Sequence, residues 1–118
     1  MTDPVERVRE VCRRFPGVTE RVSHSAPSFF AGRQFAAVWA DGHHDHAFPH
    51  LWVAAPPGAQ EELLQTSDDF FRPPYVGPRG WVGVRLDGAI GWDEVAELLE
   101  DAYRTVAPPR LVRQLDQP

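Results

Sequence analysis

Apolar residues recur along this chain at two spacings, and each spacing predicts a kind of element. Between residues 3 and 17 they fall three or four positions apart, which predicts a helix that Asp3 caps and Pro16-Gly17 ends. Its apolar stripe consists of Val5, Val8, Val11, Cys12 and Phe15. The same spacing predicts a short helix at 59–65 and a long helix from about 93 to 106, before Pro108-Pro109.

Runs of aromatic and β-branched residues predict strands at 28–31, 34–40, 50–55 and 81–86. The second run is apolar on both faces, so we expect a central strand. Proline and glycine crowd residues 72–80, which forbids regular helix there and permits at most an edge strand. Short turns between neighbouring strands require antiparallel pairing. The sequence therefore predicts a two-layer α+β fold, with an antiparallel sheet of about five strands, helices packed on one face, and the order α-β-β-β-α-β-β-α.

The composition fits one folded domain, 1–118. With 118 residues, of which 42% are hydrophobic, the chain can bury one core without disulfides or metals. Its apolar runs are short and its first residues have no signal-peptide pattern, so we expect no membrane association and a cytoplasmic location. The lone cysteine, Cys12, excludes an internal disulfide and continues the apolar stripe, so we expect it to be an inert core residue.

Five short segments, spread in order over nearly the whole chain, form a further pattern. They are Phe15-Pro16-Gly17-Val18, His24-Ser25-Ala26-Pro27-Ser28-Phe29, Phe70-Phe71-Arg72-Pro73-Pro74-Tyr75-Val76-Gly77, Gly80-Trp81-Val82-Gly83-Val84 and Asp101-Ala102-Tyr103-Arg104-Thr105-Val106-Ala107-Pro108. As an ordered set they resemble the MmcQ/YjbR family, with Ala26 standing where the family often has glycine. The resemblance implies a fold like that of secretion chaperones and a DNA-binding role. It supplies no catalytic signature.

The stretch from Phe70 to Arg85 is the main candidate for function. It contains three arginines and four aromatic residues but no carboxylate, in a chain whose net charge is −5. Aromatic rings can stack on bases while guanidinium groups hold phosphates, so this mixture suits single-stranded nucleic acid. Alternation along the strand at 81–86 turns Trp81, Gly83 and Arg85 away from the core, where they would form a shelf for a flat or anionic ligand.

A second basic cluster, at the end of the long helix and beyond it, adds Arg104 to this interpretation. The selected nucleic-acid or ligand-binding residues are Arg72, Tyr75, Arg79, Trp81, Arg85 and Arg104. The alternative for all of them is structural. In that case Trp81 packs under the proline-rich loop, Arg85 pairs with a carboxylate, and Arg104 belongs to a solvated helix end.

Histidines gather in the turn after the second strand run. His43, His44, His46 and His50 offer imidazoles that could bind zinc, but their spacing is not that of a closed metal site, so we expect an exposed turn and no metal. His24 lies between two serines without a nucleophile elbow or an identifiable carboxylate. We therefore expect no cofactor and no enzymatic activity.

Three functions remain open on the sequence. The first is a nucleic-acid-binding module, possessing no catalytic activity, for DNA or RNA. The second is a protein-interaction or chaperone-like adaptor, and the third is a binder of small anionic or aromatic ligands. We expect a monomer or a weak dimer in each case.

Overall fold

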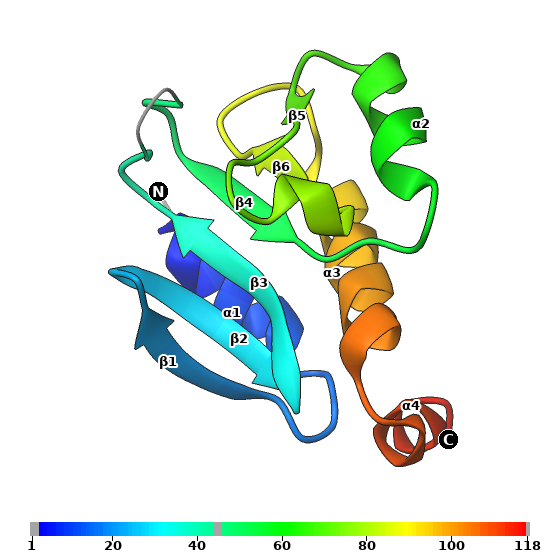
Figure 1. Cartoon of the computed structure of the whole chain (residues 1–118). Helices are drawn as coiled ribbons and strands as arrows, with labels where there is room; N and C mark the ends of the chain where they lie inside the picture. The colour runs from blue at the N-terminus through cyan, green and yellow to red at the C-terminus, as the bar shows by residue number, and fades with distance from the viewer. Residues whose placement is uncertain (1–2, 44–45, 118) are drawn as a thin grey trace.

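Six strands form one antiparallel sheet in the order β1-β2-β3-β4-β6-β5 (Figure 1). The strands are β1 (Thr19–Ser23), β2 (Ala26–Ala31), β3 (Arg33–Trp39), β4 (His50–Val53), β5 (Phe70–Phe71) and β6 (Val82–Arg85). The computed structural model describes residues 3–43 and 46–117. β3 pairs on both sides, so the expected central strand is confirmed.

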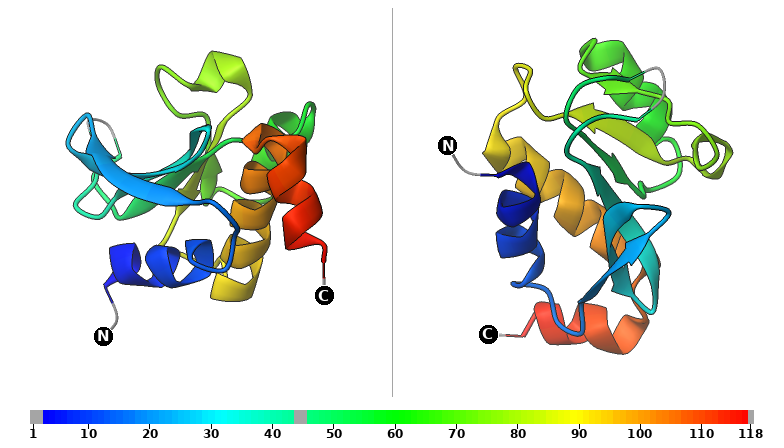
Figure 2. Two further views of the ribbon diagram at one scale, coloured as in Figure 1. Left: turned by 90° about the horizontal axis from the view of Figure 1, so that it is seen from below. Right: turned by 90° about the vertical axis from the view of Figure 1, so that its left-hand side faces the viewer.

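Four α-helices accompany the sheet: α1 (Pro4–Cys12), α2 (Ala59–Thr66), α3 (Trp92–Val106) and α4 (Pro109–Leu115). α1 and α3 lie side by side against one face of the sheet, while α2 packs beside β5 (Figures 1 and 2). A 3-10 turn, η1 (Gly77–Arg79), lies on the other side. The predicted α+β class, with helices packed against an antiparallel sheet, is confirmed. We call the face opposite α1 and α3 the open face.

The first helix begins where the sequence predicts. Asp3 accepts a hydrogen bond from the Val5 amide at 2.9 Å, and Pro4 occupies the first helical position, where its missing N–H leaves no bond unmade. Val8, Val11 and Cys12 are buried. The apolar stripe therefore sets which side of α1 meets the sheet.

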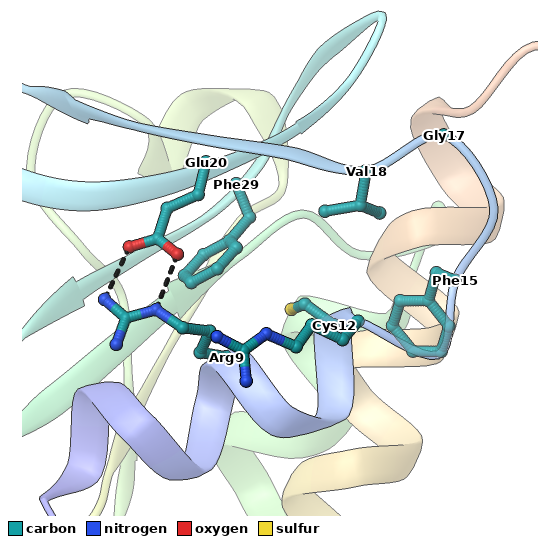
Figure 3. Close-up of a pocket in the computed structure, with 8 residues that line it drawn as sticks. Arg9, Cys12, Phe15, Gly17, Val18, Glu20 and Phe29 are labelled. Atoms are coloured by element: carbon teal, nitrogen blue, oxygen red, sulfur yellow. Dashed lines mark hydrogen bonds and ion pairs between the residues drawn. The ribbon is translucent and has the colours of Figure 1, made fainter.

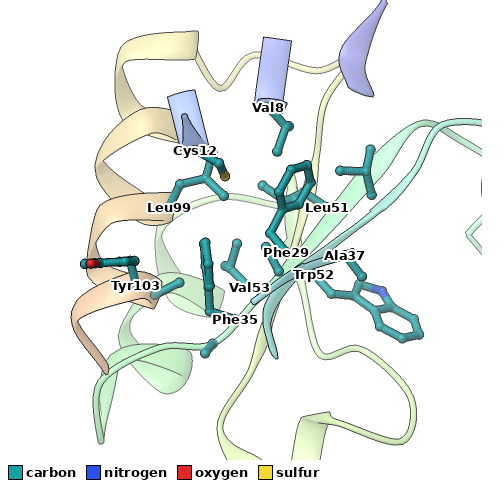
Figure 4. Close-up of a cluster of buried hydrophobic side chains, with 14 of the residues drawn as sticks. Val8, Cys12, Phe29, Phe35, Ala37, Leu51, Trp52, Val53, Leu99 and Tyr103 are labelled. Atoms are coloured by element: carbon teal, nitrogen blue, oxygen red, sulfur yellow. The ribbon is translucent and has the colours of Figure 1, made fainter. Parts of the chain in front are cut away.

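The core lies between these helices and the sheet (Figure 4). Leu99 and Tyr103 of α3 face Phe35 of β3, whose ring centre is 5.8 Å from that of Tyr103. The Tyr103 hydroxyl donates to the carbonyl of Pro16 at 2.6 Å, so the one polar atom of that ring is satisfied. Figure 4 shows Trp52 on the other side of the strands, pointing away from α3.

An irregularity in β3 decides which residues reach the open face. Phe29 pairs with Ala36 but Phe30 pairs with Gln34, so Phe35 is an inserted residue of a β-bulge. Consecutive residues Phe35 and Ala36 can then both face the helices. The alternation resumes with Ala37 and Trp39 on the same face as Gln34, which is the face away from the core.

The edge strand allowed at residues 72–80 lies instead just before them, at Phe70–Phe71, and residues 72–80 contain the 3-10 turn η1. β1 and α4 were not predicted either. β1 has the sequence Thr-Glu-Arg-Val-Ser, which contains one apolar residue and so gives no strand pattern. This polar sequence suits an edge strand, in which four of the five residues are exposed. α4 was missed because Pro108-Pro109 signals a stop, yet Pro109 also opens the next helix. No helix in the described ranges combines the length and the apolar character needed to cross a bilayer.

Candidate functional site

A hollow of about 520 Å³ lies on the open face, between the tip of the β1–β2 hairpin and the proline-rich loop. Its lining, which defines the open-face pocket, is Ser23, His24, Gln34, Ala37, Trp39, His43, Trp52, Tyr75, Val76 and Arg79. The volume is within the range of small-molecule sites. Because the lining comes from both halves of the chain, the pocket forms only when the sheet is assembled.

Aromatic rings form much of the pocket wall. Ala37 and Trp52 are directly paired across β3 and β4, and Trp39 lies two residues along β3 on the same face. The Trp39 and Trp52 ring centres are 4.9 Å apart, and the His43 ring lies 4.1 Å from Trp39. Tyr75 approaches the His43 ring edge to face at 6.4 Å. Trp52 is buried and backs the wall, so the stacking surface for a flat group comes from Tyr75 and from the half-buried rings of Trp39 and His43.

The two pocket tryptophans carry an unsatisfied donor each. The indole N–H groups of Trp39 and Trp52 are shielded from solvent and have no hydrogen-bond partner among the described residues. An indole nitrogen is a donor only, and a buried donor without an acceptor destabilises the fold by about 1–3 kcal/mol. These donors therefore mark a face of the sheet that is less completely satisfied than the helix-covered face.

The charge of the pocket is opposite to that of the chain. Arg79 is exposed and forms no ion pair within residues 3–43 and 46–117, and its guanidinium lies 5.4 Å from the centre of the Trp81 ring. No carboxylate lines the pocket among residues 3–43 and 46–117. An anionic group therefore meets a permanent positive charge there without competition from Asp or Glu.

Strained backbone surrounds the pocket. Within the described residues, three non-glycine residues have positive φ: His24 (51°), Ser25 (70°) and Tyr75 (64°). His24 and Tyr75 line the pocket. Tyr75 is also 75% exposed, so packing does not explain a large ring in the left-handed region. His24 and Ser25 form the two-residue turn between β1 and β2, a hairpin geometry that itself requires positive φ at both residues. Tyr75 has no such explanation, and strain of this kind is typical of functional positions, where a side chain must point in a particular direction.

A second group of rings covers the rest of the open face. Phe71 of β5 lies over Gly83 of β6, and the His46 ring stacks on Phe71 at 4.0 Å. His50 is fully buried, and its Nδ1 lies 2.8 Å from the Phe48 carbonyl, which only accepts, so Nδ1 carries the proton. Burial lowers the pKa of His50.

Metal binding by these histidines finds no geometric support. In residues 3–43 and 46–117, no three His, Cys, Asp or Glu side chains converge in a way that could hold a metal ion. His43 and His46 instead stack on Trp39 and Phe71. His44 lies outside the described residues.

Comparison with known proteins identifies the family. The YjbR family model matches residues 13–105. This chain belongs to the YjbR family. The crystal structure of Deinococcus radiodurans protein DR2400, which has a DUF419 family-model domain, matches 97% of this chain and 88% of that one, with a TM-score of 0.75 and 23% sequence identity. That identity shows a shared fold. No curated protein matches the chain.

The predicted MmcQ/YjbR resemblance is thus confirmed. The six residues predicted to bind a nucleic acid or ligand do not all lie at one site. Tyr75 and Arg79 both line the open-face pocket. Arg72 lies outside the pocket lining: its side chain crosses Gly77 and donates to Gln60 at 3.2 Å. In this YjbR chain Arg72 therefore braces the loop that carries the two pocket residues.

The expected shelf of Trp81, Gly83 and Arg85 is wrong, although these residues do face away from the core. Trp81 is only 3% exposed, which leaves no ring surface for a base. A Cβ at Gly83 would lie 2.3 Å from Phe71, so that ring already fills the position above it. Arg85 lies over Phe48 and pairs with Asp87, and this pairing raises the pKa of Arg85.

Arg104 does not join the pocket. It lies on α3, which covers the opposite face of the sheet, and it pairs with Glu100 at 3.0 Å and Asp116 at 2.6 Å. The continuous basic surface expected from the sequence is therefore not assembled. One arginine of the selected set, Arg79, remains available at the pocket.

Sequence reasoning missed Trp39, Trp52 and Gln60. Trp39 and Trp52 were assigned to strands, and only the bulge at Phe35 reveals that they share the open face. Gln60 had a readable signal: it precedes Leu63 and Leu64 by three and four residues, so a polar side chain occupies the apolar face of its helix. A buried amide in such a position must bind to something.

A second hollow, of about 370 Å³, lies between α1 and β1 (Figure 3). Arg9 donates to both carboxylate oxygens of Glu20 at 2.7 Å and to Glu6 at 2.6 Å, so its charge is already used. The bond to Arg9 also lowers the pKa of Glu20. Burial raises the pKa of the Cys12 thiol to about 12, which makes it a poor nucleophile, consistent with a core role.

Proposed function

We propose that this YjbR-family chain is a binding module, without catalytic activity, for a nucleotide unit, meaning a flat base with its phosphate. The base enters the open-face pocket and stacks against its rings, and the phosphate pairs with Arg79. The observation that carries the proposal is Tyr75, a 75% exposed ring held at φ 64° beside a pocket whose described lining contains an arginine and no carboxylate.

The chemistry of the lining favours a nucleotide over an aliphatic anion. Stacking of one base on an aromatic side chain contributes about 1–3 kcal/mol, and a charge-assisted hydrogen bond to phosphate contributes about as much.

Catalysis is not part of the proposal. Ser23 and His24 both line the pocket, but no hydrogen bond joins them within residues 3–43 and 46–117. The described lining also lacks a carboxylate that could orient His24 as a base. The residues present can hold a ligand, and we assign them that role.

Calorimetric titration with uridine monophosphate and with uridine tests the proposal. Arg79→Ala should weaken uridine monophosphate about tenfold and leave uridine unchanged, because only the phosphate contact is lost. Tyr75→Gly should weaken both, because stacking is lost. Arg113→Ala removes the same charge from an exposed position on α4 and should have no effect. Absence of binding by the unaltered chain would refute the proposal.

The nucleotide unit could come from a free nucleotide or from a single strand of nucleic acid. Titration with a ten-nucleotide oligothymidylate separates the two sources. If the oligonucleotide binds at least ten times more tightly and its affinity falls steeply with salt, the single strand is the ligand, because several phosphates are then neutralised. Equal affinity of the mononucleotide, with a shallow salt dependence, indicates the free nucleotide.

The adaptor alternative would use a different surface. β1 is an exposed edge strand, and its Val22 is 71% exposed, which suits addition of a strand from a partner. Val22→Lys should abolish such an interaction and leave nucleotide binding unchanged. The two functions therefore separate by mutation.

A further inference from the structure

The loop at residues 72–80, here called the pocket loop, carries Tyr75 and Arg79, but most of its hydrogen bonds stay within it. The Gly77 amide donates to the Pro73 carbonyl at 3.1 Å, and the Arg79 amide donates to the Val76 carbonyl at 3.0 Å. These bonds fold the loop into a turn. They do not fix where that turn sits on the sheet.

One side chain outside the loop fixes that position. Gln60 Nε2 donates to the Gly77 carbonyl at 2.9 Å and to the Trp81 carbonyl at 2.6 Å, and its Oε1 accepts from Arg72 at 3.2 Å. Among the described residues, every hydrogen bond from the pocket loop to another part of the chain goes to Gln60. A single amide thus contacts the start, the middle and the exit of the loop.

The burial of Gln60 strengthens these hydrogen bonds. Gln60 is 9% exposed in the first turn of α2, so its hydrogen bonds are made with little competition from water. Both of its N–H donors are used, on carbonyls four residues apart that bracket Arg79. The Arg72 side chain also lies against Gly77, where an added Cβ would be 2.9 Å from it. Two side chains that bind each other, Gln60 and Arg72, therefore both contact the turn.

We propose that Gln60 is a positioning residue for the open-face pocket, which sets ligand affinity without touching the ligand. The inference rests on the proposed nucleotide-binding function. Removal of its amide frees the pocket loop from the sheet and lets the hydrogen bonds within the loop open more often. Only the molecules whose loop is in place can then bind the ligand, so the apparent affinity is the intrinsic affinity multiplied by the fraction of such molecules.

Two measurements on Gln60→Leu test this role, because leucine keeps the bulk and removes both donors. Amide hydrogen exchange at Gly77, Arg79 and Gly80 should become at least tenfold faster, while exchange in β3 changes much less. The dissociation constant for uridine monophosphate should rise about tenfold. Gln65→Leu, at an exposed position of the same helix, is the matched control and should change neither quantity.

The outcomes are distinguishable from those that test the function itself. If the unaltered chain does not bind uridine monophosphate, the proposed function fails, and hydrogen exchange in Gln60→Leu still decides whether Gln60 holds the loop. Unchanged loop exchange in that variant would overturn the inference, as would a uniform increase across loop and β3 alike, which indicates a purely structural role. Should Gln60→Leu fail to fold, Arg72→Leu, which removes one of the three bonds, should show the same pattern to a smaller degree.

Discussion

The two faces of this sheet differ in the side chains that they carry and in how completely their polar groups are hydrogen-bonded. On the helix-covered face, aliphatic residues such as Val38, Leu51 and Val84 pair across strands and are almost completely buried. On the open face, the same strands carry rings, and two of these, Trp39 and Trp52, keep buried N–H groups without partners. The helix-covered face is packed with aliphatic side chains that need no hydrogen bonds, whereas the open face contains buried N–H groups that have none among the described residues.

Backbone strain follows the same division. The non-glycine residues with positive φ in the described ranges are His24, Ser25 and Tyr75, and they lie at or beside the open-face pocket. The positive φ of His24 and Ser25 belongs to the two-residue turn between β1 and β2. The strain at Tyr75 and the unpaired donors reduce stability, so a sequence optimised for folding alone would avoid them. We infer that the helix-covered face supplies the stability of the fold and the open face supplies its function.

The largest expected effect is on the helix-covered face. Leu99→Ala should lower the free energy of unfolding by about 3 kcal/mol, because a fully buried side chain is lost and a cavity remains. Urea denaturation measures this change. The half-buried neighbour Leu98→Ala is the control and should show about half the effect. Equal effects at the two positions would contradict the assignment of the core to one side of α3.

A smaller loss of stability is expected at Gly83, on the open face, because the Phe71 ring covers it closely. Gly83→Ala places a Cβ 2.3 Å from the Phe71 ring, which must move together with the His46 ring stacked on it. The free energy of unfolding should fall by about 2 kcal/mol. At Gly91, the N-cap of α3, an added Cβ meets no atom within 4 Å, so Gly91→Ala should lower the free energy of unfolding only by the loss of the preferred cap residue, at most about 1 kcal/mol. Similar results for both variants would show that Phe71 does not cover the strand.

The pH dependence of stability reports on the buried imidazole of the open face. Burial lowers the pKa of His50, so the unfolded chain binds a proton at a higher pH than the folded chain. This contribution to stability is complete above about pH 6.5 and is lost progressively as the pH falls below it toward the folded-state pKa. Denaturation at a series of pH values should show this loss, and His50→Gln should reduce it. An unchanged pH profile in that variant would assign the loss to other groups.

The smallest expected change in stability is at Tyr75. Tyr75→Gly relieves the positive φ but gives the unfolded chain more freedom, so the free energy of unfolding should stay the same or rise by up to about 1 kcal/mol. A thermal or urea midpoint measures this. A clear loss of stability would mean that the Tyr75 ring is structural. It would contradict the inference that the open face serves function rather than stability.

The helix-covered face could be predicted from the sequence because its signals are local and repetitive. The Asp3 cap, the stripe through Val8 and Cys12, and the alternation of Val82 and Val84 each follow from residue spacing. The edge strand β1 could not be predicted, since an exposed edge favours polar residues and lacks a hydrophobic period.

The candidate site was predicted only in part. Tyr75 and Arg79 were selected because ring and charge lie close together in the sequence, and both line the pocket. Trp81 was selected for the same reason but is buried beneath Arg79. Trp39 and Trp52 reach the pocket through strand register and a bulge, which depend on pairing between distant segments rather than on local composition.

The central claim, that a nucleotide unit binds on the open face, is tested most directly by the four indole N–H signals in a nitrogen–proton correlation spectrum of the isotope-labelled chain. On titration with uridine monophosphate, the signals of Trp39 and Trp52 should shift, because both rings line the pocket. The signal of Trp92, which lies on α3 beneath the Arg7 guanidinium, should not move. Shifts confined to Trp92, or no shift at saturating nucleotide, would contradict the claim.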